Sequence, residues 1–353
     1  MNKQALRADI LLLLTAGIWG FGFVAQRSGM EYVGPFAFNG IRFILGSLSL
    51  VPLILFRQRR YIARTAAVSA TQAATAVHCD VKYAVSLKTF IFCSFSAGFC
   101  LFIAVILQQF GIMFTTAGNA GFITGLYVVL TPIFGIFLGR KTGPATWLGS
   151  LLTLAGLYFL SAAGKLNAIN PGDVITVLSA LFWTFHVLII DRLVQKIDPV
   201  ILSSGQFAVC GFFSLAGAFL AEPYLAALAG HINPNLLHSG LFAWQPFPEL
   251  LAGFSASTIT AGAFIPILYG GLGSVGIAYT LQAVAQRDAP PAHATIILCF
   301  EGCFAALGGA LLLNEKIGTW TLLGFVLMLS GMLATQWDVI AKTGNREQRV
   351  ENR

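Results

Sequence analysis

The chain alternates between long apolar runs and short polar breaks. Ten runs of about 20 residues are continuously hydrophobic, which is the length that a helix needs to cross a bilayer. Strands of a membrane barrel are about 10 residues long and alternate between apolar and polar positions, and these runs do not. Breaks such as SGMEYVGP and RKTGP carry the Gly, Pro and charged residues that are typical of turns. The pattern predicts an all-α, polytopic integral membrane protein with ten transmembrane helices. We place them at residues 9–27, 35–56, 89–113, 118–138, 144–163, 172–191, 199–221, 259–284, 291–313 and 318–337.

The pattern also occurs twice. A shift of 164 positions lays Trp19 over Trp183, and a shift of 174 positions lays Gln108 over Gln282. A shift of 175 positions lays KTGPATWLGSLLTLAG over KIGTWTLLGFVLMLSG, with eight identities in 16 positions. Each copy holds five spans, and because five is odd, the second copy must lie upside down in the membrane relative to the first.

Inverted repeats are typical of secondary transporters, in which the substrate binds near the midplane between the two halves. We predict a first five-helix repeat at residues 1–163, with a connection at 57–88, and a second at 171–340, with a connection at 222–258. Residues 341–353 form a tail.

Composition and charge agree with a membrane protein and indicate its orientation. Only 10% of the residues are charged, against about 25% in soluble domains. The net charge of +7 comes from basic residues in turns, without the basic stripe of a nucleic-acid-binding surface. Seventeen Lys and Arg fall on the side of the N-terminus and three on the other side. The positive-inside rule therefore predicts that both termini are cytoplasmic.

Several segments resemble the EamA-type transporters of the drug/metabolite transporter superfamily. They are ADILLLLTAGIWGFGFVAQR, GPFAFNGIRFILGSL, AYTLQAVAQ and LCFEGCFAALGGALLLNEKIGTWTLLGFVLMLSG. The resemblance implies ten helices in two inverted repeats and an exporter of small metabolites or drugs in a bacterial inner membrane. The family's ninth span commonly reads LEPVFA, whereas this chain reads FEGCFA. Glu301 is kept, but Gly302 replaces the proline, so a kink in this helix is not assured.

Two charged residues within the spans are the strongest site candidates. Glu301 is the one acidic residue placed well inside a span, near the midplane, and intramembrane carboxylates often mark proton or substrate pathways. Arg42 lies roughly 10 Å into the second span. It either anchors its helix by hydrogen bonds, attracts an anionic substrate group or pairs with Glu301. Glu301 either joins helices by hydrogen bonds or exchanges protons, and we expect the latter.

The remaining candidates are uncharged or aromatic. Trp19 and Trp183 either line a central space or pack between the halves. His186 either relays protons or is held by a structural hydrogen bond. Interhelical hydrogen bonding and cavity lining both stay open for the polar residues Gln108, Gln282 and Asn119.

These features favour a secondary transporter that exports or exchanges a small metabolite or drug-like compound by alternating access, with protons as a candidate coupling ion. The alternatives are an integral-membrane enzyme acting on a lipid-linked substrate and a passive facilitator. No HExxH or GxSxG motif supports an enzyme. We expect no cofactor, no metal and no nucleic-acid partner. A homodimer remains open.

Overall fold

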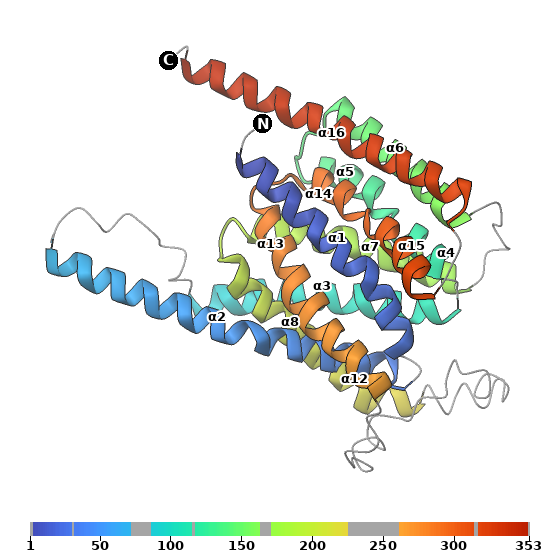
Figure 1. Ribbon diagram of the computed structural model, residues 1–353. Helices are drawn as coiled ribbons and strands as arrows, with labels where there is room; N and C mark the ends of the chain where they lie inside the picture. Colours follow the sequence, from blue (N-terminus) through green and yellow to red (C-terminus); the bar gives the residue numbers. More distant parts are fainter. Residues whose placement is uncertain are drawn as a thin grey trace.

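A computed structural model describes residues 3–29, 32–71, 86–114, 117–162, 171–224, 261–313 and 317–351. All regular elements in these ranges are helical (Figure 1), which confirms the predicted all-α fold class. Residues 72–85 of the 57–88 connection and residues 225–258 of the 222–258 connection lie outside the described residues.

Within the part of the first repeat that the structure describes there are six helices. They are α1 (Lys3–Gly29), α2 (Pro35–Thr71), α3 (Leu87–Phe114), α4 (Ala117–Thr124), α5 (Tyr127–Phe137) and α6 (Pro144–Ala162). The fourth predicted span, expected as one helix over 118–138, is interrupted between α4 and α5. At the interruption the N–H groups of Leu126 and Val128 donate to the carbonyls of Ile123 and Gly125, three residues back instead of four. The tighter turn ends one α-helix and starts the next.

The described residues of the second repeat form eight helical elements. They are α7 (Pro171–Leu193), α8 (Pro199–Leu220), α12 (Ala261–Leu268), the π-helix η3 (Tyr269–Tyr279), α13 (Thr280–Gln286), α14 (Pro291–Leu298), α15 (Glu301–Leu313) and α16 (Thr319–Glu351). Asp198 begins α8 as its N-cap, because its carboxylate accepts the N–H groups of Val200 and Ile201. The ninth span is interrupted at Cys299 and Phe300, although Gly302 stands where the family has proline.

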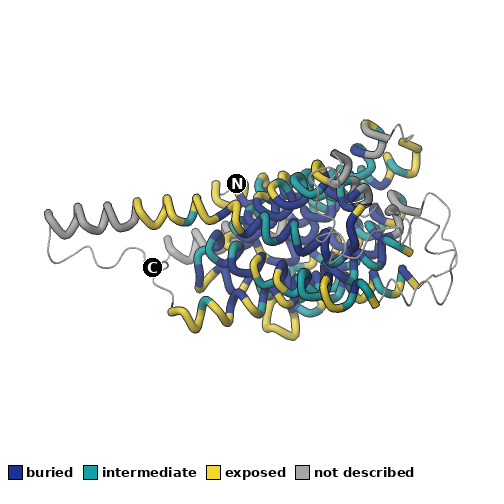
Figure 2. Tube along the Cα trace, turned by 90° about the horizontal axis from the view of Figure 1, so that it is seen from below, coloured by how far each residue is buried: buried dark blue, intermediate teal, exposed yellow. Residues whose placement is uncertain are grey.

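The described chain crosses the membrane ten times. Seven helical segments are long and apolar enough to span it, and Tyr127–Phe137 and Thr319–Thr335 are shorter apolar helices. The 19 residues of α6 complete the set. Figure 2 shows buried residues along the middle of the bundle and exposed ones around it. Many exposed side chains are large and apolar, including Phe92, Phe137 and Leu311, as contact with lipid requires.

The contact between α6 and α16 shows how the repeats are related. A Cβ added at Gly149 would lie 2.6 Å from the carbonyl oxygen of Gly331, and one at Gly156 would lie 2.7 Å from that of Gly324. At the shift of 175 positions, Gly149 corresponds to Gly324 and Gly156 to Gly331. Gly149 therefore contacts the repeat partner of Gly156, and Gly156 contacts the repeat partner of Gly149. This is the reciprocal contact that a two-fold axis produces. The two helices run side by side in Figure 1.

The bundle has two distinguishable ends. Both described chain ends, Lys3 and Glu351, lie at the same end (Figure 1), which we call the terminal face. The opposite end, the distal face, contains Glu222, which follows α8. Its carboxylate accepts the N–H groups of Phe36 and Ala37 at 2.7 and 3.0 Å. These N–H groups lack partners within the first turn of α2, so Glu222 ties α8 to the start of α2.

Glu222 predicts a pH dependence of stability. Burial raises the pKa of Glu222 to about 7, although the N–H groups of Ala37 and Phe36 lower it. A carboxyl whose folded pKa lies above its unfolded value of 4.5 favours the folded state while protonated, and this contribution is lost as pH rises from about 4.5 through 7. We expect the melting temperature to fall less between pH 5 and 8 in Glu222→Gln than in wild type. Thermal unfolding in detergent measures it, and an identical slope in both proteins would contradict the assignment.

Candidate functional site

A cavity lies where both repeats meet. Its volume is about 40 Å³, which is room for about three water molecules at 10–15 Å³ each. The lining residues come from α1, α3, α4, α5, α7, η3, α13, α14 and α15. They are Trp19, Phe23, Gln26, Gln108, Thr124, Tyr127, Trp183, Val187, Ser274, Tyr279, Gln282, Leu298 and Glu301.

Most of the lining consists of repeat-related pairs. The shift of 164 positions relates two pairs on the wall, and the shift of 174 positions relates three more. The pairs are Trp19 with Trp183, Phe23 with Val187, Gln108 with Gln282, Thr124 with Leu298, and Tyr127 with Glu301. The interruptions at residues 125–126 and 299–300 are also 174 positions apart. The cavity therefore lies on the pseudo-two-fold axis.

Three aromatic rings form one wall. The Tyr279 ring centroid lies 4.5 Å from that of Trp19 and 6.0 Å from that of Trp183. The Tyr279 and Trp183 rings are nearly parallel, at 15°. The Trp19 indole N–H donates to the carbonyl of Ser274 at 3.3 Å, which fixes its ring. We call Trp19, Trp183 and Tyr279 the aromatic wall.

Glu301 provides the carboxylate of the cavity. It is the first residue of α15, where the helix dipole favours a negative charge. Tyr127, its repeat partner, lies with it on the cavity wall. The backbone of Gly20 on α1 approaches closely here, because an added Cβ would lie 2.7 Å from the Glu301 carbonyl oxygen. In the middle of this span, Trp19 thus places its ring on the cavity wall, and the next residue, Gly20, allows α1 to approach α15 closely.

Arg42 is buried outside the cavity wall. Its Nε donates to the side-chain oxygen of Asn39 at 2.9 Å. Its guanidinium carbon lies 5.4 Å from the Phe38 ring centroid and 5.1 Å from that of Phe43, so aromatic faces balance the charge. Among the residues that the structure describes, no ion pair joins Arg42 to Glu301. Asn39 and the two phenylalanines all lie on α2 itself.

The other candidates fall into two groups. Gln108 and Gln282 lie on the cavity wall, together with Trp19, Trp183 and Glu301. His186 lies behind the aromatic wall, where its Nε2 hydrogen-bonds the Gln206 side chain at 3.0 Å. Its ring contacts the edges of Trp183 and Tyr279. The side chain of Asn119 lies outside the described residues.

Sequence reasoning missed several lining residues. Tyr279 contacts both tryptophans, but an aromatic residue in an apolar span carries no distinctive pattern. The repeat offered a signal for others, because Tyr127 lies 174 positions before Glu301. Phe23 likewise lies 164 positions before Val187 on the opposite wall.

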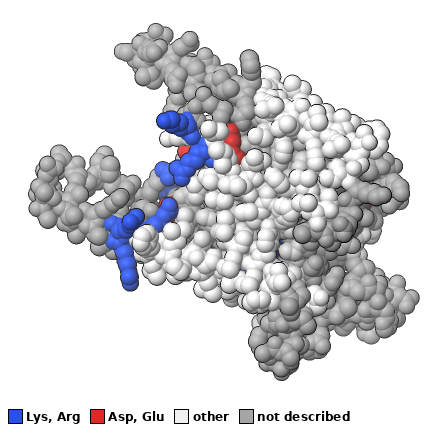
Figure 3. All heavy atoms as spheres, in the orientation of Figure 1, with Lys and Arg blue, Asp and Glu red and all other residues white. Residues whose placement is uncertain are grey.

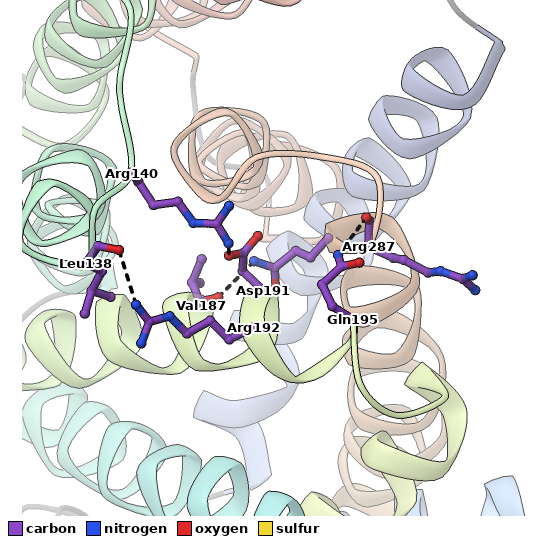
Figure 4. A network of polar contacts seen from close by, with 8 residues as sticks. Leu138, Arg140, Val187, Asp191, Arg192, Gln195 and Arg287 are labelled. Atoms are coloured by element: carbon purple, nitrogen blue, oxygen red, sulfur yellow. Dashed lines mark hydrogen bonds and ion pairs between the residues drawn. The ribbon is translucent and has the colours of Figure 1, made fainter. Parts of the chain in front are cut away.

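Polar contacts join the helices at the terminal face (Figure 4). Arg140, in the turn before α6, forms an ion pair with Asp191 on α7. Arg192 donates to the carbonyl of Leu138 at 3.3 Å, and Gln195 donates to that of Arg287 at 2.9 Å. We call these contacts the terminal gate. The Arg140–Asp191 and Arg192–Leu138 contacts join the two repeats, and the Gln195–Arg287 contact lies within the second repeat.

A second buried contact lies at the same end. His293 at the start of α14 contacts Asp9 of α1 at 2.7 Å through Nε2. Its Nδ1 lies 3.1 Å from the hydroxyl of Thr335 on α16. The imidazole therefore bridges three helices. Together with the terminal gate, the contacts of His293 join helices at the terminal face by polar interactions in addition to apolar packing.

Comparisons with known proteins place the chain in a family. An uncharacterized transporter of Archaeoglobus fulgidus is 26% identical over 337 residues, covering 94% of this chain and 86% of that protein. Solute carrier family 35 member F6 of Mus musculus is 23% identical over 265 residues, covering 66% and 67%. A solved structure titled "Crystal structure of protein" shares the fold, with a TM-score of 0.66, 15% identity and coverage of 93% and 95%.

The family match extends over both repeats. The EamA-like transporter family matches residues 6–162 and 170–336. Its members and the named relatives are transporters and not enzymes, which agrees with the multi-pass helical fold. The chain belongs to the EamA-like transporter family, and it is a membrane transporter of the drug/metabolite type.

Proposed function

We propose that this protein is a secondary transporter that exports or exchanges a small organic solute by alternating access. The observation that carries the proposal is the position of the cavity on the axis between two inverted repeats, with repeat-related residues on its walls. Two halves of similar structure and opposite orientation can exchange conformations, and each exchange exposes the central cavity to the other side.

The terminal gate supports this mechanism. It joins the repeats at one end by the Arg140–Asp191 ion pair and the hydrogen bond from Arg192 to the carbonyl of Leu138, which can form and break as discrete contacts. Opening toward the terminal face requires Arg140 to separate from Asp191. The conformation seen here is therefore closed at that end, and the alternate conformation opens it.

Removing the ion pair should favour the open terminal face. In Asp191→Asn, a cysteine introduced at the cavity residue Val187 should react several-fold faster with an impermeant thiol reagent applied from the terminal side. The exposed residue Lys196 lies at the same end outside the gate, so Lys196→Gln is the matched control. Equal reaction rates in Asp191→Asn and wild type would remove this ion pair from the gate.

The terminal face is proposed to lie in the cytoplasm, with the protein in a bacterial inner membrane. Figure 3 shows Lys and Arg gathered at the edge of the molecule where both termini lie. The positive-inside rule assigns such a basic face to the cytoplasm. The labelling experiment also tests this orientation, because the reagent should reach position 187 of Asp191→Asn faster in inside-out vesicles than in right-side-out ones.

Glu301 is proposed to couple transport to protons. Its carboxyl lies on the cavity wall, where it can contact a solute. A proton and a solute that compete for one carboxylate produce exchange across the membrane. Purified protein in liposomes with a trapped pH dye tests the function. Proton movement should follow solute addition, whereas a passive facilitator would only equilibrate the solute.

A further inference from the structure

We infer that the cavity selects an organic cation with a compact aromatic body. This inference rests on the proposed transport function and names its substrate class. It follows from three features of the cavity: the charge of its walls, its aromatic faces and the hydrogen-bond status of its polar groups.

The charge of the walls favours a cation. Glu301 is the one formally charged side chain among the thirteen lining residues. Arg42, buried nearby, is held by Asn39, Phe38 and Phe43 and does not line the cavity. Arg140 is paired with Asp191 in the terminal gate. An anionic solute would therefore add a second negative charge beside Glu301 in a site of low dielectric constant, whereas a cation balances it.

The aromatic wall favours the same charge. Trp19 is inclined at 59° to the Tyr279 ring and at 50° to the Trp183 ring. The Tyr279 and Trp183 rings are nearly parallel, and the Trp19 ring is inclined to both. Three electron-rich aromatic rings therefore border one side of the cavity. The negative face of such rings attracts an ammonium group, most strongly when water is excluded. A flat hydrocarbon body also stacks against rings of this size.

The polar groups of the cavity require few partners from a solute. Gln108 donates to the hydroxyl of Thr124 at 3.2 Å, and Gln282 donates to the side chain of Gln286 at 3.1 Å. Solutes rich in hydroxyl groups would compete with these existing bonds. The side-chain oxygen of Gln26 is buried without a protein partner. This oxygen is an acceptor, as is the Glu301 carboxylate, and both suit a ligand that donates from N–H groups, whereas the indole N–H of Trp183, also buried without a protein partner, offers one donor to the solute.

Three probes with one body and different head groups test the charge preference. Phenethylamine is a cation at neutral pH, phenethyl alcohol is neutral, and 3-phenylpropanoate is an anion. We expect phenethylamine to bind the purified full-length protein at least tenfold more tightly than either analogue. The readouts are tryptophan fluorescence, since Trp19 and Trp183 line the cavity, and the ligand-induced rise in melting temperature.

Variants assign the preference to Glu301. Glu301→Gln should bring the three affinities within about threefold of one another. Glu222→Gln removes a different buried carboxylate, outside the cavity, and should keep the full preference. Glu301→Asp, which retains the charge, should keep most of the preference for the cation. This variant tests the role of the carboxylate if Glu301→Gln does not fold. Equal or tighter binding of the alcohol or the anion to wild type would overturn the inference, as would a preference that survives Glu301→Gln.

Transport separates this inference from the proposed function. Phenethyltrimethylammonium, which has a permanent charge and does not cross lipid readily, is used for flux into liposomes. If a pH gradient drives the anion or the alcohol but no cation, the substrate class is wrong and the transport function stands. Phenethylamine could instead bind through Glu301 while a pH gradient causes no transport of any probe. That result would support the cation-binding site and contradict proton-coupled transport of these probes.

Discussion

Glu301→Gln is expected to abolish the accumulation of solute driven by a pH gradient while leaving the protein folded. Glutamine retains the size of the side chain and can still form hydrogen bonds. It cannot ionise, so it neither exchanges a proton nor attracts a cationic head group. An ionisable residue buried in a membrane is expensive to keep there and commonly marks the transport pathway, and its removal should therefore affect flux far more than stability.

The measurement is uptake into liposomes with and without an imposed pH gradient. Wild type should accumulate solute with the gradient, and Glu301→Gln should fall at least 100-fold, to the level of empty liposomes. Glu222→Gln is the control for the loss of a buried carboxylate outside the cavity. Gradient-driven uptake that persists in Glu301→Gln would remove this residue from the coupling mechanism.

Gly20→Ala is expected to disrupt the contact between α1 and α15. A Cβ at this position would lie 2.5 Å from the Cβ of Phe304, 2.7 Å from the carbonyl oxygen of Glu301 and 2.8 Å from the backbone nitrogen of Ala305. Backbone atoms cannot move aside as a flexible side chain does, so α1 must shift away from the cavity. Overpacking of this kind costs about 1–3 kcal/mol, and it displaces Trp19 and Glu301 together.

Gly17→Ala is the matched control, because it lies one turn away on the same helix. A Cβ there would lie 3.8 Å from the ring of Phe304, an ordinary van der Waals distance. We expect Gly20→Ala to lower the melting temperature in detergent by several degrees and to remove most transport activity, with Gly17→Ala close to wild type. Equal melting temperatures for the two variants would contradict the close helix contact.

The architecture was predictable because membrane spans leave a strong signal. Continuous apolar runs fix the helices, and the match between KTGPATWLGSLLTLAG and KIGTWTLLGFVLMLSG reveals the duplication. The same matches indicated part of the cavity, since Trp19 and Trp183 correspond in the repeat and both line it. Glu301 stood out because a carboxylate within a span is rare.

Other features depend on packing that a linear pattern does not encode. Arg42 could pair with Glu301 as far as the sequence shows, but Phe38, Phe43 and Asn39 surround it instead. The π-helix η3 was expected to be an ordinary helix. Hydrophobicity does not distinguish the two forms, and the difference lies in the hydrogen-bond spacing. α14 ends before Glu301 without a proline, because the N–H groups of Phe300 and Gly302 donate to carbonyls three residues back instead of four.

Alternating access between the two faces can be tested most directly by distances between spin labels. One pair, at positions 141 and 288, spans the repeats at the terminal face, and another, at positions 32 and 317, spans them at the distal face; all four residues are exposed. Double electron–electron resonance in liposomes, at a pH that protonates Glu301 and at one that ionises it, should show the first distance growing as the second shrinks. Distances that stay constant at both faces, or that grow together, would contradict alternating access.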